Sequence, residues 1–309
     1  MRETKQESVE ELKKLAGKGY GPKERPKVNV HIHLPPNFSA FESVEQAVKL
    51  AEQEGIGVLG VSNYYDFTVY GEFSKRAEQA GIFPLFGLEI IALIDELVAR
   101  KIKINDPGNP GKMYICGKGI NRFEQPTKRA SELLATIRQN DDKRMAEMIG
   151  KLDAVFTACG LTTGLDTEAI VEGVVSRHGC DSKTVTLQER HIAQAFQEVL
   201  FEKVEPEQRG ELLGKLLGVP AKSGVEDAVG IQGEIRSALM KAGKPAFVAE
   251  SFVDFEQARE LILELGGIPC YPTLADGADP ICEYEEPVEK LIEQLKINNI
   301  YMAELVPIR

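Results

Sequence analysis

The stretch that decides the fold is VNVHIHL, residues 28–34, in which apolar and polar residues alternate. A period of two predicts a β-strand with one buried face, and it places His31 and His33 together on the other face. Two imidazoles that lie two residues apart on a strand can reach the same metal ion. A polar pair on a half-exposed strand is the alternative interpretation, and the pattern alone leaves both open.

Two further strands follow at regular spacing. GVLGVSNYYDF (57–67) and FPLFGLEII (83–91) contain apolar runs, and amphipathic helical patterns separate the three strands. This alternation predicts βαβ units around a parallel sheet or barrel. Strand ends form the active-site rim of such a barrel, so we expect Glu89 beside the two histidines. A carboxylate there either completes a divalent metal site or pairs with a lysine or arginine.

Helical periodicity then dominates between about 127 and 243. A short strand is expected at 245–249, and the βα pattern resumes with strands at 268–272 and 300–308. No covering helix follows the last strand, so we expect a barrel that lacks its final strands. The expected parts are an N-terminal helical extension (1–26), an incomplete α/β barrel (27–126 and 244–309) and an all-α insertion or lid (127–243).

Composition narrows the range of partners. The chain of 309 residues has 37 basic and 48 acidic side chains, a formal charge of −11, which makes nucleic acid an unfavourable partner. Its five cysteines are scattered without a CxxC pair, which is typical of reduced thiols in the cytoplasm. We find no leader-like segment and no apolar run of about 18 residues, so we expect a cytoplasmic protein without membrane contact.

Together these stretches resemble the polymerase and histidinol phosphatase (PHP) family, in which HxH, Asp-His and Gly-x-Glu end the first three strands. QERHIAQAF (188–196) is similar to a helix motif in the insert of the family's small-phosphoesterase branch. The segment 244–272 is similar to the one leading to that branch's next barrel histidine. The resemblance covers about 28–308 in order. It implies a distorted seven-stranded (β/α) barrel that binds two or three Zn, Mn or Fe ions. It also implies that the protein hydrolyses phosphate esters.

Several family positions differ in this sequence. Asn63 and Tyr64 stand where the family has Asp-His, Tyr271 stands in place of a barrel histidine, and the final Asp-x-His has no counterpart. With four histidines in the chain, a full multinuclear site cannot be assembled. We therefore expect fewer than three ions. The expected metal ligands are His31, His33, Glu89 and Asn63, with Asp66 as a further oxygen donor.

Three residues are candidates for catalysis, the two tyrosines from the hypothesis of a metal-dependent phosphoesterase and the histidine from the resemblance. Tyr64 or Tyr271 would donate a hydrogen bond or a proton to the leaving oxygen. His191 would contact the substrate phosphate from the insertion, although it also lies beside an apolar helical stripe and fits a boundary position equally well. Thr186 and Glu189 are expected to form the capping box of that helix.

The first functional hypothesis is a metal-dependent phosphoesterase that acts on a small phosphorylated substrate. The alternative is a PHP-like binding or regulatory protein that has lost catalysis. A nucleic-acid-processing module is disfavoured by the acidic charge and by the lack of basic runs. The sequence gives no indication of the oligomeric state.

Overall fold

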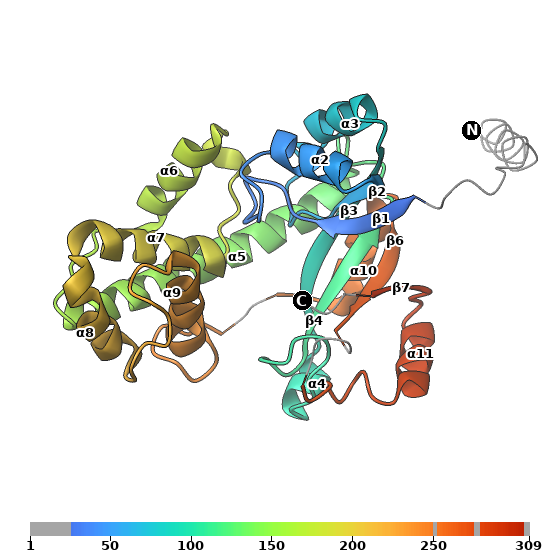
Figure 1. Ribbon diagram of the computed structural model, residues 1–309. Helices are drawn as coiled ribbons and strands as arrows, with labels where there is room; N and C mark the ends of the chain where they lie inside the picture. The colour runs from blue at the N-terminus through green and yellow to red at the C-terminus, as the bar shows by residue number, and fades with distance from the viewer. Residues whose placement is uncertain (1–25, 250–251, 275–278, 306–309) are drawn as a thin grey trace, which may run out of the picture.

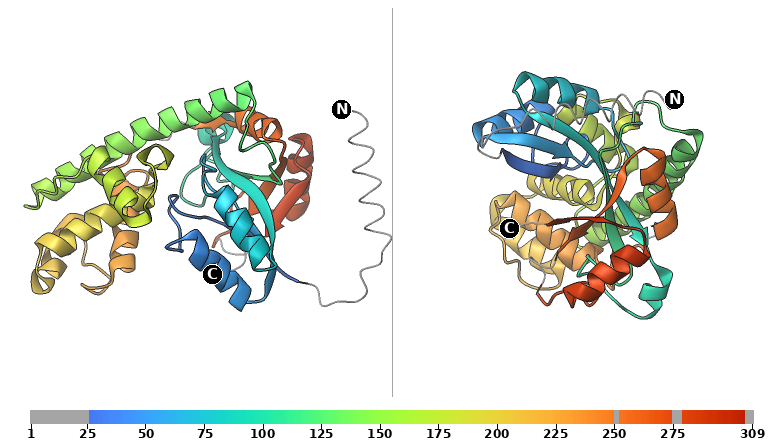
Figure 2. Two further views of the ribbon diagram at one scale, coloured as in Figure 1. Left: turned by 90° about the horizontal axis from the view of Figure 1, so that it is seen from above. Right: turned by 90° about the vertical axis from the view of Figure 1, so that its right-hand side faces the viewer.

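The computed structural model describes residues 26–249, 252–274 and 279–305, and the predicted N-terminal helix lies outside these ranges. Figure 1 shows a mixed α/β molecule in which a sheet with flanking helices lies beside a group of helices. The long helix α5 (Lys128–Ala158) runs from one part into the other, as the left view of Figure 2 shows. The elements from Lys128 to Met240 are all helices.

The sheet has seven strands in the order β1-β2-β3-β4-β6-β7, with β5 paired to β3. The strands are β1 (Lys27–Ile32), β2 (Ile56–Val61), β3 (Phe83–Leu93), β4 (Lys112–Lys118), β5 (Val253–Asp254), β6 (Ile268–Thr273) and β7 (Met302–Leu305). Neighbours β1, β2 and β3 are parallel, as are β6 and β7. In contrast, β4 is antiparallel to both β3 and β6. The expectation of a parallel sheet is therefore wrong at its centre. A parallel neighbour of β3 would need a connection that crosses over the sheet, whereas the chain here turns back and forms β4 antiparallel to β3.

The sheet curls strongly. Strands β1 and β7 are the two ends of the strand order, yet His31 Nδ1 on β1 lies 2.7 Å from Glu304 Oε1 on β7. Only a sheet that bends round on itself brings its two edges this close. The right view of Figure 2 shows this curvature. The α/β class is confirmed, with a barrel-like half-closed sheet.

Helices α2 (Val44–Gln53), α3 (Tyr70–Gln79) and α10 (Phe255–Glu264) pack on the sheet. Helix α11 (Val288–Ile297) adds Leu291 and Leu295 to the same core, whereas the short helix α4 (Asp95–Ala99) buries no residue. Two of these helices begin at a capping side chain, since Ser43 Oγ accepts from Gln46 N at 3.1 Å and Asp254 Oδ1 accepts from Gln257 N at 2.8 Å. Helix α10 packs on β3, β4 and β6, which buries the apolar face of the sheet.

The second group of helices has its own core. It contains α6 (Thr167–His178), the 3₁₀ turn η1 (Ser182–Thr184), α7 (Glu189–Lys203), α8 (Pro206–Leu217), α9 (Ala228–Ile235) and the π-helix η2 (Arg236–Met240). Apolar residues of α5 between 130 and 137 pack into the sheet core, whereas those between 145 and 156 pack among these helices. Helix α5 thereby contributes to both cores. No helix of the described ranges combines the length and apolarity of a membrane span.

The strand expected at 245–249 is absent, since these residues form a turn and irregular backbone. Ala246 and Val248 are buried in the core of the helical group. The apolar residues of 245–249 thus reflect packing on helices. The short strand β5 forms a few residues later.

Candidate metal centre

Three side chains predicted from the sequence meet on the inner face of the sheet. His31 lies on β1, His33 follows directly after that strand, and Glu89 lies within β3, which continues to Leu93. Glu89 Oε2 is 3.1 Å from His33 Nε2 and 3.6 Å from His31 Nε2. The β1–β2 register shifts between Asn29 and Ile32, an irregularity of the kind that re-aims side chains near active sites.

The donor spacing fits one divalent ion. A tetrahedral ion with bonds of about 2.0–2.1 Å separates its ligand atoms by roughly 3.3 Å. The two contacts of Glu89 Oε2 lie on either side of this value. His31, His33 and Glu89 each offer a ligand atom within 4.8 Å of the others. Two imidazoles and a carboxylate are a donor set that Zn, Mn and Fe accept, so these residues can hold such an ion.

Electrostatics favours a cation at this place. Burial would raise the pKa of Glu89, but hydrogen bonds and charges from His31 and His33 hold it well below its usual range. Burial likewise lowers the pKa of His31, but the carboxylates of Glu304 and Glu89 outweigh it and raise that pKa to about 9. A positive charge between these carboxylates is therefore stabilised.

Tyr64 belongs to the same cluster. Its ring stacks on His33 with centroids 5.0 Å apart and planes at 3°, and its hydroxyl is close enough to Glu89 to feel the charge of that carboxylate. Burial and then the charge of Glu89 raise the pKa of Tyr64 far above its usual value. The phenol therefore stays protonated and acts as a hydrogen-bond donor.

A second group lies beside the first and was missed from the sequence. His31, Cys116 of β4 and Glu304 of β7 also bring three ligand atoms within 4.8 Å of one another. Cys116 Sγ donates to Glu304 Oε1 at 3.3 Å, and Lys118 Nζ lies 2.7 Å from Glu304 Oε2. Burial, and then the charge of Glu89, raise the pKa of Cys116 well above the usual thiol value.

The strand β4 carried a usable signal for this group. In KMYICGK (112–118) the alternate positions Lys112, Tyr114, Cys116 and Lys118 are polar or reactive, and they share one face of the strand. Cys116 pairs with Glu89 across β3–β4, so this face is the one that carries Glu89 and the two histidines. Nothing in the sequence of the final strand indicates that Glu304 belongs to this group, because its partner His31 lies 273 residues earlier.

Asn63 and Asp66 are held elsewhere in the loop after β2. The Asn63 amide accepts from Leu34 N at 2.8 Å and donates to Leu34 O at 3.0 Å, so both ends are occupied. Asp66 accepts from Thr68 and pairs with Arg138 at 3.4 Å. Neither side chain is among those that the structure brings together around the two histidines. Asn63 instead ties the end of β1 to the end of β2.

Tyr271 does not face the cluster. The pairing of Cys116 with Cys270 puts Cys270 on the inner face, so its neighbour Tyr271 points to the opposite face. Its ring is buried in the core, and its hydroxyl donates to Glu285 Oε1 at 3.0 Å. The predicted strand is confirmed, but the structure does not bring this phenol to the metal ligands.

His191 lies in the first turn of α7 and is buried at 3% exposure. Its Nδ1 accepts from Gln188 N at 3.1 Å, so Gln188 and His191, rather than Thr186 and Glu189, form the capping box of this helix, which corrects that expectation. Its ring also packs edge-on against Phe38, in the loop that follows His33. Burial lowers the pKa of His191 to about 3. The structure therefore places His191 near that loop, and outside the ligand cluster.

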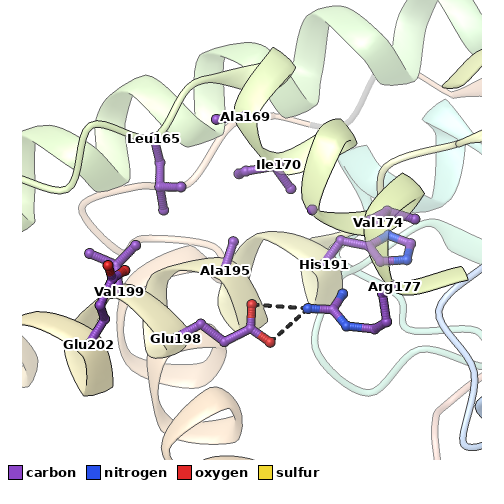
Figure 3. Close-up of a pocket in the computed structure, with 11 residues that line it drawn as sticks. Leu165, Ala169, Ile170, Val174, Arg177, His191, Ala195, Glu198, Val199 and Glu202 are labelled. Carbon is purple, nitrogen blue, oxygen red and sulfur yellow. Dashed lines mark hydrogen bonds and ion pairs between the residues drawn. The ribbon is translucent and has the colours of Figure 1, made fainter.

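His191 also borders a groove of about 170 Å³ between α6 and α7 (Figure 3). Arg177 and Glu198 form an ion pair at 2.7 Å across this groove. The groove lies within the helical group, so it is separate from the cluster of His31, His33 and Glu89 on the sheet.

Comparison with known proteins gives matches in structure alone. No protein-family model matches the sequence, and no curated protein matches it. An amidohydrolase from Chromobacterium violaceum, solved with bound sulfate and no metal, is similar with a TM-score of 0.59 at 15% identity, over 90% of this chain and 76% of that one. A protein from Bifidobacterium adolescentis, proposed to be a metal-dependent phosphoesterase, is similar with a TM-score of 0.59 at 12% identity, over 92% and 78%. The chain thus has the barrel-like fold of these hydrolases.

Proposed function

We propose that this chain is a metal-dependent hydrolase of the PHP type that acts on small phosphate esters. The observation that carries the proposal is the convergence of His31 Nε2, His33 Nε2 and Glu89 Oε2 at the spacing of ligands to one ion. The similarity to a proposed metal-dependent phosphoesterase supports it at the level of fold. Zn, Mn or Fe bound there would supply a Lewis acid that activates water and polarises a phosphoryl oxygen.

The side chains around the ion have separate tasks. His31, His33 and Glu89 would bind it, and the ring of Tyr64 holds His33 in place by stacking on it. Because the phenol stays protonated, Tyr64 is also the group that can donate a hydrogen bond to the leaving oxygen. His191 and Tyr271 are not needed in this arrangement.

The test is reconstitution of the metal-stripped chain with Zn²⁺ or Mn²⁺, followed by hydrolysis of p-nitrophenyl phosphate. We expect activity that depends on added metal and falls at least a hundredfold in Glu89→Gln, in line with the loss of a ligand to the catalytic ion. Glu289→Gln on the exposed surface of α11 is the matched control and should retain activity. Activity that persists without metal, or that Glu89→Gln leaves unchanged, would refute the proposal.

A second candidate is a PHP-like binding protein without catalysis. The observation that favours it is that His31 and Lys118 already neutralise Glu304, so part of the charge at this site is satisfied within the protein. Metal binding that depends on Glu89, without turnover of any phosphate ester, would support this candidate over the enzyme.

A further inference from the structure

Lys118 crosses the inside of the curled sheet. Its Nζ lies 2.7 Å from Glu304 Oε2 on β7, 3.0 Å from Val30 O on β1 and 3.1 Å from Ser62 Oγ after β2. The ammonium group donates hydrogen bonds to Val30 O and Ser62 Oγ and forms an ion pair with Glu304 Oε2. All three contacts lie within the sheet, so the role of Lys118 is internal.

Gly87 keeps the path of this lysine clear. It is the register partner of Lys118 across β3–β4. A Cβ on Gly87 would lie 2.6 Å from Gly117 O and 3.1 Å from Ser62 Oγ, the atom to which Lys118 donates. Glycine here permits the close packing that lets Lys118 reach from β4 to the far strands.

The two carboxylate oxygens of Glu304 have different contacts, since Oε2 accepts no hydrogen bond from the described residues. Oε1 lies 2.7 Å from His31 Nδ1 and accepts from Cys116 Sγ, while Oε2 faces Lys118. A carboxylate of this kind only accepts, so the hydrogen of a neutral His31 sits on Nδ1. The lone pair is then on Nε2, the atom that faces Glu89. Carboxylate partners of this type fix the ring orientation of metal-binding histidines.

We propose that Glu304 and Lys118 are positioning residues of a one-ion centre. Glu304 holds His31 by its Nδ1 hydrogen so that Nε2 faces the ion, and the ammonium of Lys118 occupies the place beside Glu304 that a second ion would need. This inference rests on the proposed function, because it requires an ion at His31, His33 and Glu89. The rival arrangement is a second metal ion held by His31, Cys116 and Glu304.

The experiment measures Zn²⁺ affinity and stoichiometry of the full chain by calorimetry and elemental analysis. We expect one equivalent in the wild type. Glu304→Ala should weaken Zn²⁺ binding by about 10–100-fold, the usual effect of losing such a partner, without changing the stoichiometry. Glu304→Gln should lose less, because its amide oxygen can still accept the Nδ1 hydrogen. Glu289→Gln is the matched surface control.

Two spectroscopic readouts separate positioning from ligation. In the zinc-loaded wild type, long-range ¹H–¹⁵N spectra should show His31 with its proton on Nδ1. In the cobalt-loaded wild type, no thiolate-to-metal charge-transfer band should appear. The rival arrangement predicts two equivalents and a charge-transfer band that Cys116→Ser abolishes.

Each outcome decides between the alternatives. Two equivalents in the wild type, a proton on His31 Nε2, or unchanged affinity in Glu304→Ala would overturn the positioning role. If Glu304→Ala fails to fold, the isosteric Glu304→Gln and the tautomer of the wild type still test it. Metal binding and hydrolysis that depend on Glu89 but not on Glu304 would refute this inference alone, whereas a wild type that binds no metal refutes the proposed function as well.

Discussion

Replacing Lys118 with methionine should destabilise the metal-free protein strongly. The side chains of Lys118 and Glu304 are 14% and 9% exposed, so their ion pair is screened little by solvent. Removing one member of a buried pair costs about 3–5 kcal/mol, because the other charge is left buried without its partner. Glu304 keeps His31 at 2.7 Å, so we expect the lower end, about 3 kcal/mol.

Urea unfolding at pH 7, followed by circular dichroism, measures this free energy. Lys296→Met, on the exposed side of α11, is the matched control and should change stability by less than about 0.5 kcal/mol. The double variant Lys118→Met/Glu304→Gln should be more stable than Lys118→Met alone, because it removes the uncompensated carboxylate. A loss no larger than the control's, or strict additivity of the two substitutions, would refute the proposed ion pair.

Three further predictions concern other parts of the molecule. Glu189 is buried against Lys241 and Arg144, each at 2.6 Å, which lower its pKa from 4.5 to about 2 although burial opposes this. The contribution of Glu189 to stability is therefore present above pH 4.5 and is lost as pH falls toward 2. In urea unfolding, the difference in stability between wild type and Glu189→Gln should shrink between pH 7 and pH 3. A difference that stays constant over this range would contradict the prediction. Tyr64→Phe keeps the ring on His33 but removes the protonated hydroxyl beside Glu89, so calorimetry should show about tenfold weaker Zn²⁺ binding. An unchanged Kd would exclude a role of this hydroxyl in metal binding. Leu152 is fully buried in α5 among the insertion helices, so Leu152→Ala should lower the free energy of unfolding by about 2–5 kcal/mol. The Zn²⁺ affinity should stay unchanged, because the cavity lies in the separate helical core. A large change in affinity would show that the two cores are coupled.

The ligand cluster could be anticipated because its signals are local. Alternation along residues 28–34 puts His31 and His33 on one face, and the position of Glu89 in the third strand puts it on the neighbouring inner face. The structure brings these three side chains together. Helix caps at Ser43 and Asp254 were predictable for the same reason, since each depends on a residue three positions away.

Strand direction and long-range partners could not be predicted in this way. A hydrophobic pattern has no polarity, so the sequence of β4 reads the same whether that strand is parallel or antiparallel. The short apolar stretch 245–249 fits a strand pattern but packs on helices, which only the tertiary structure decides. Glu304 and Lys118 become visible as a pair only when the curled sheet brings β4 and β7 to β1.

His191 and Tyr271 show the limit of arguments from motif position. Each was expected to act on the substrate because of its place in a motif, yet each has a local partner, Gln188 N for the histidine and Glu285 for the phenol. Burial of both side chains was not apparent from the sequence, since a polar residue beside an apolar stripe is compatible with either face.

The most direct test of the account is the coordination of Zn²⁺ in the metal-loaded full-length chain, measured by X-ray absorption together with elemental analysis. We expect one ion per chain, with two imidazole nitrogens and at least one carboxylate oxygen, and loss of the imidazole signal when His31 and His33 are both replaced by alanine. An ion with sulfur in its first shell, or one that remains bound in this double variant, would contradict the assignment of His31, His33 and Glu89 as the metal centre.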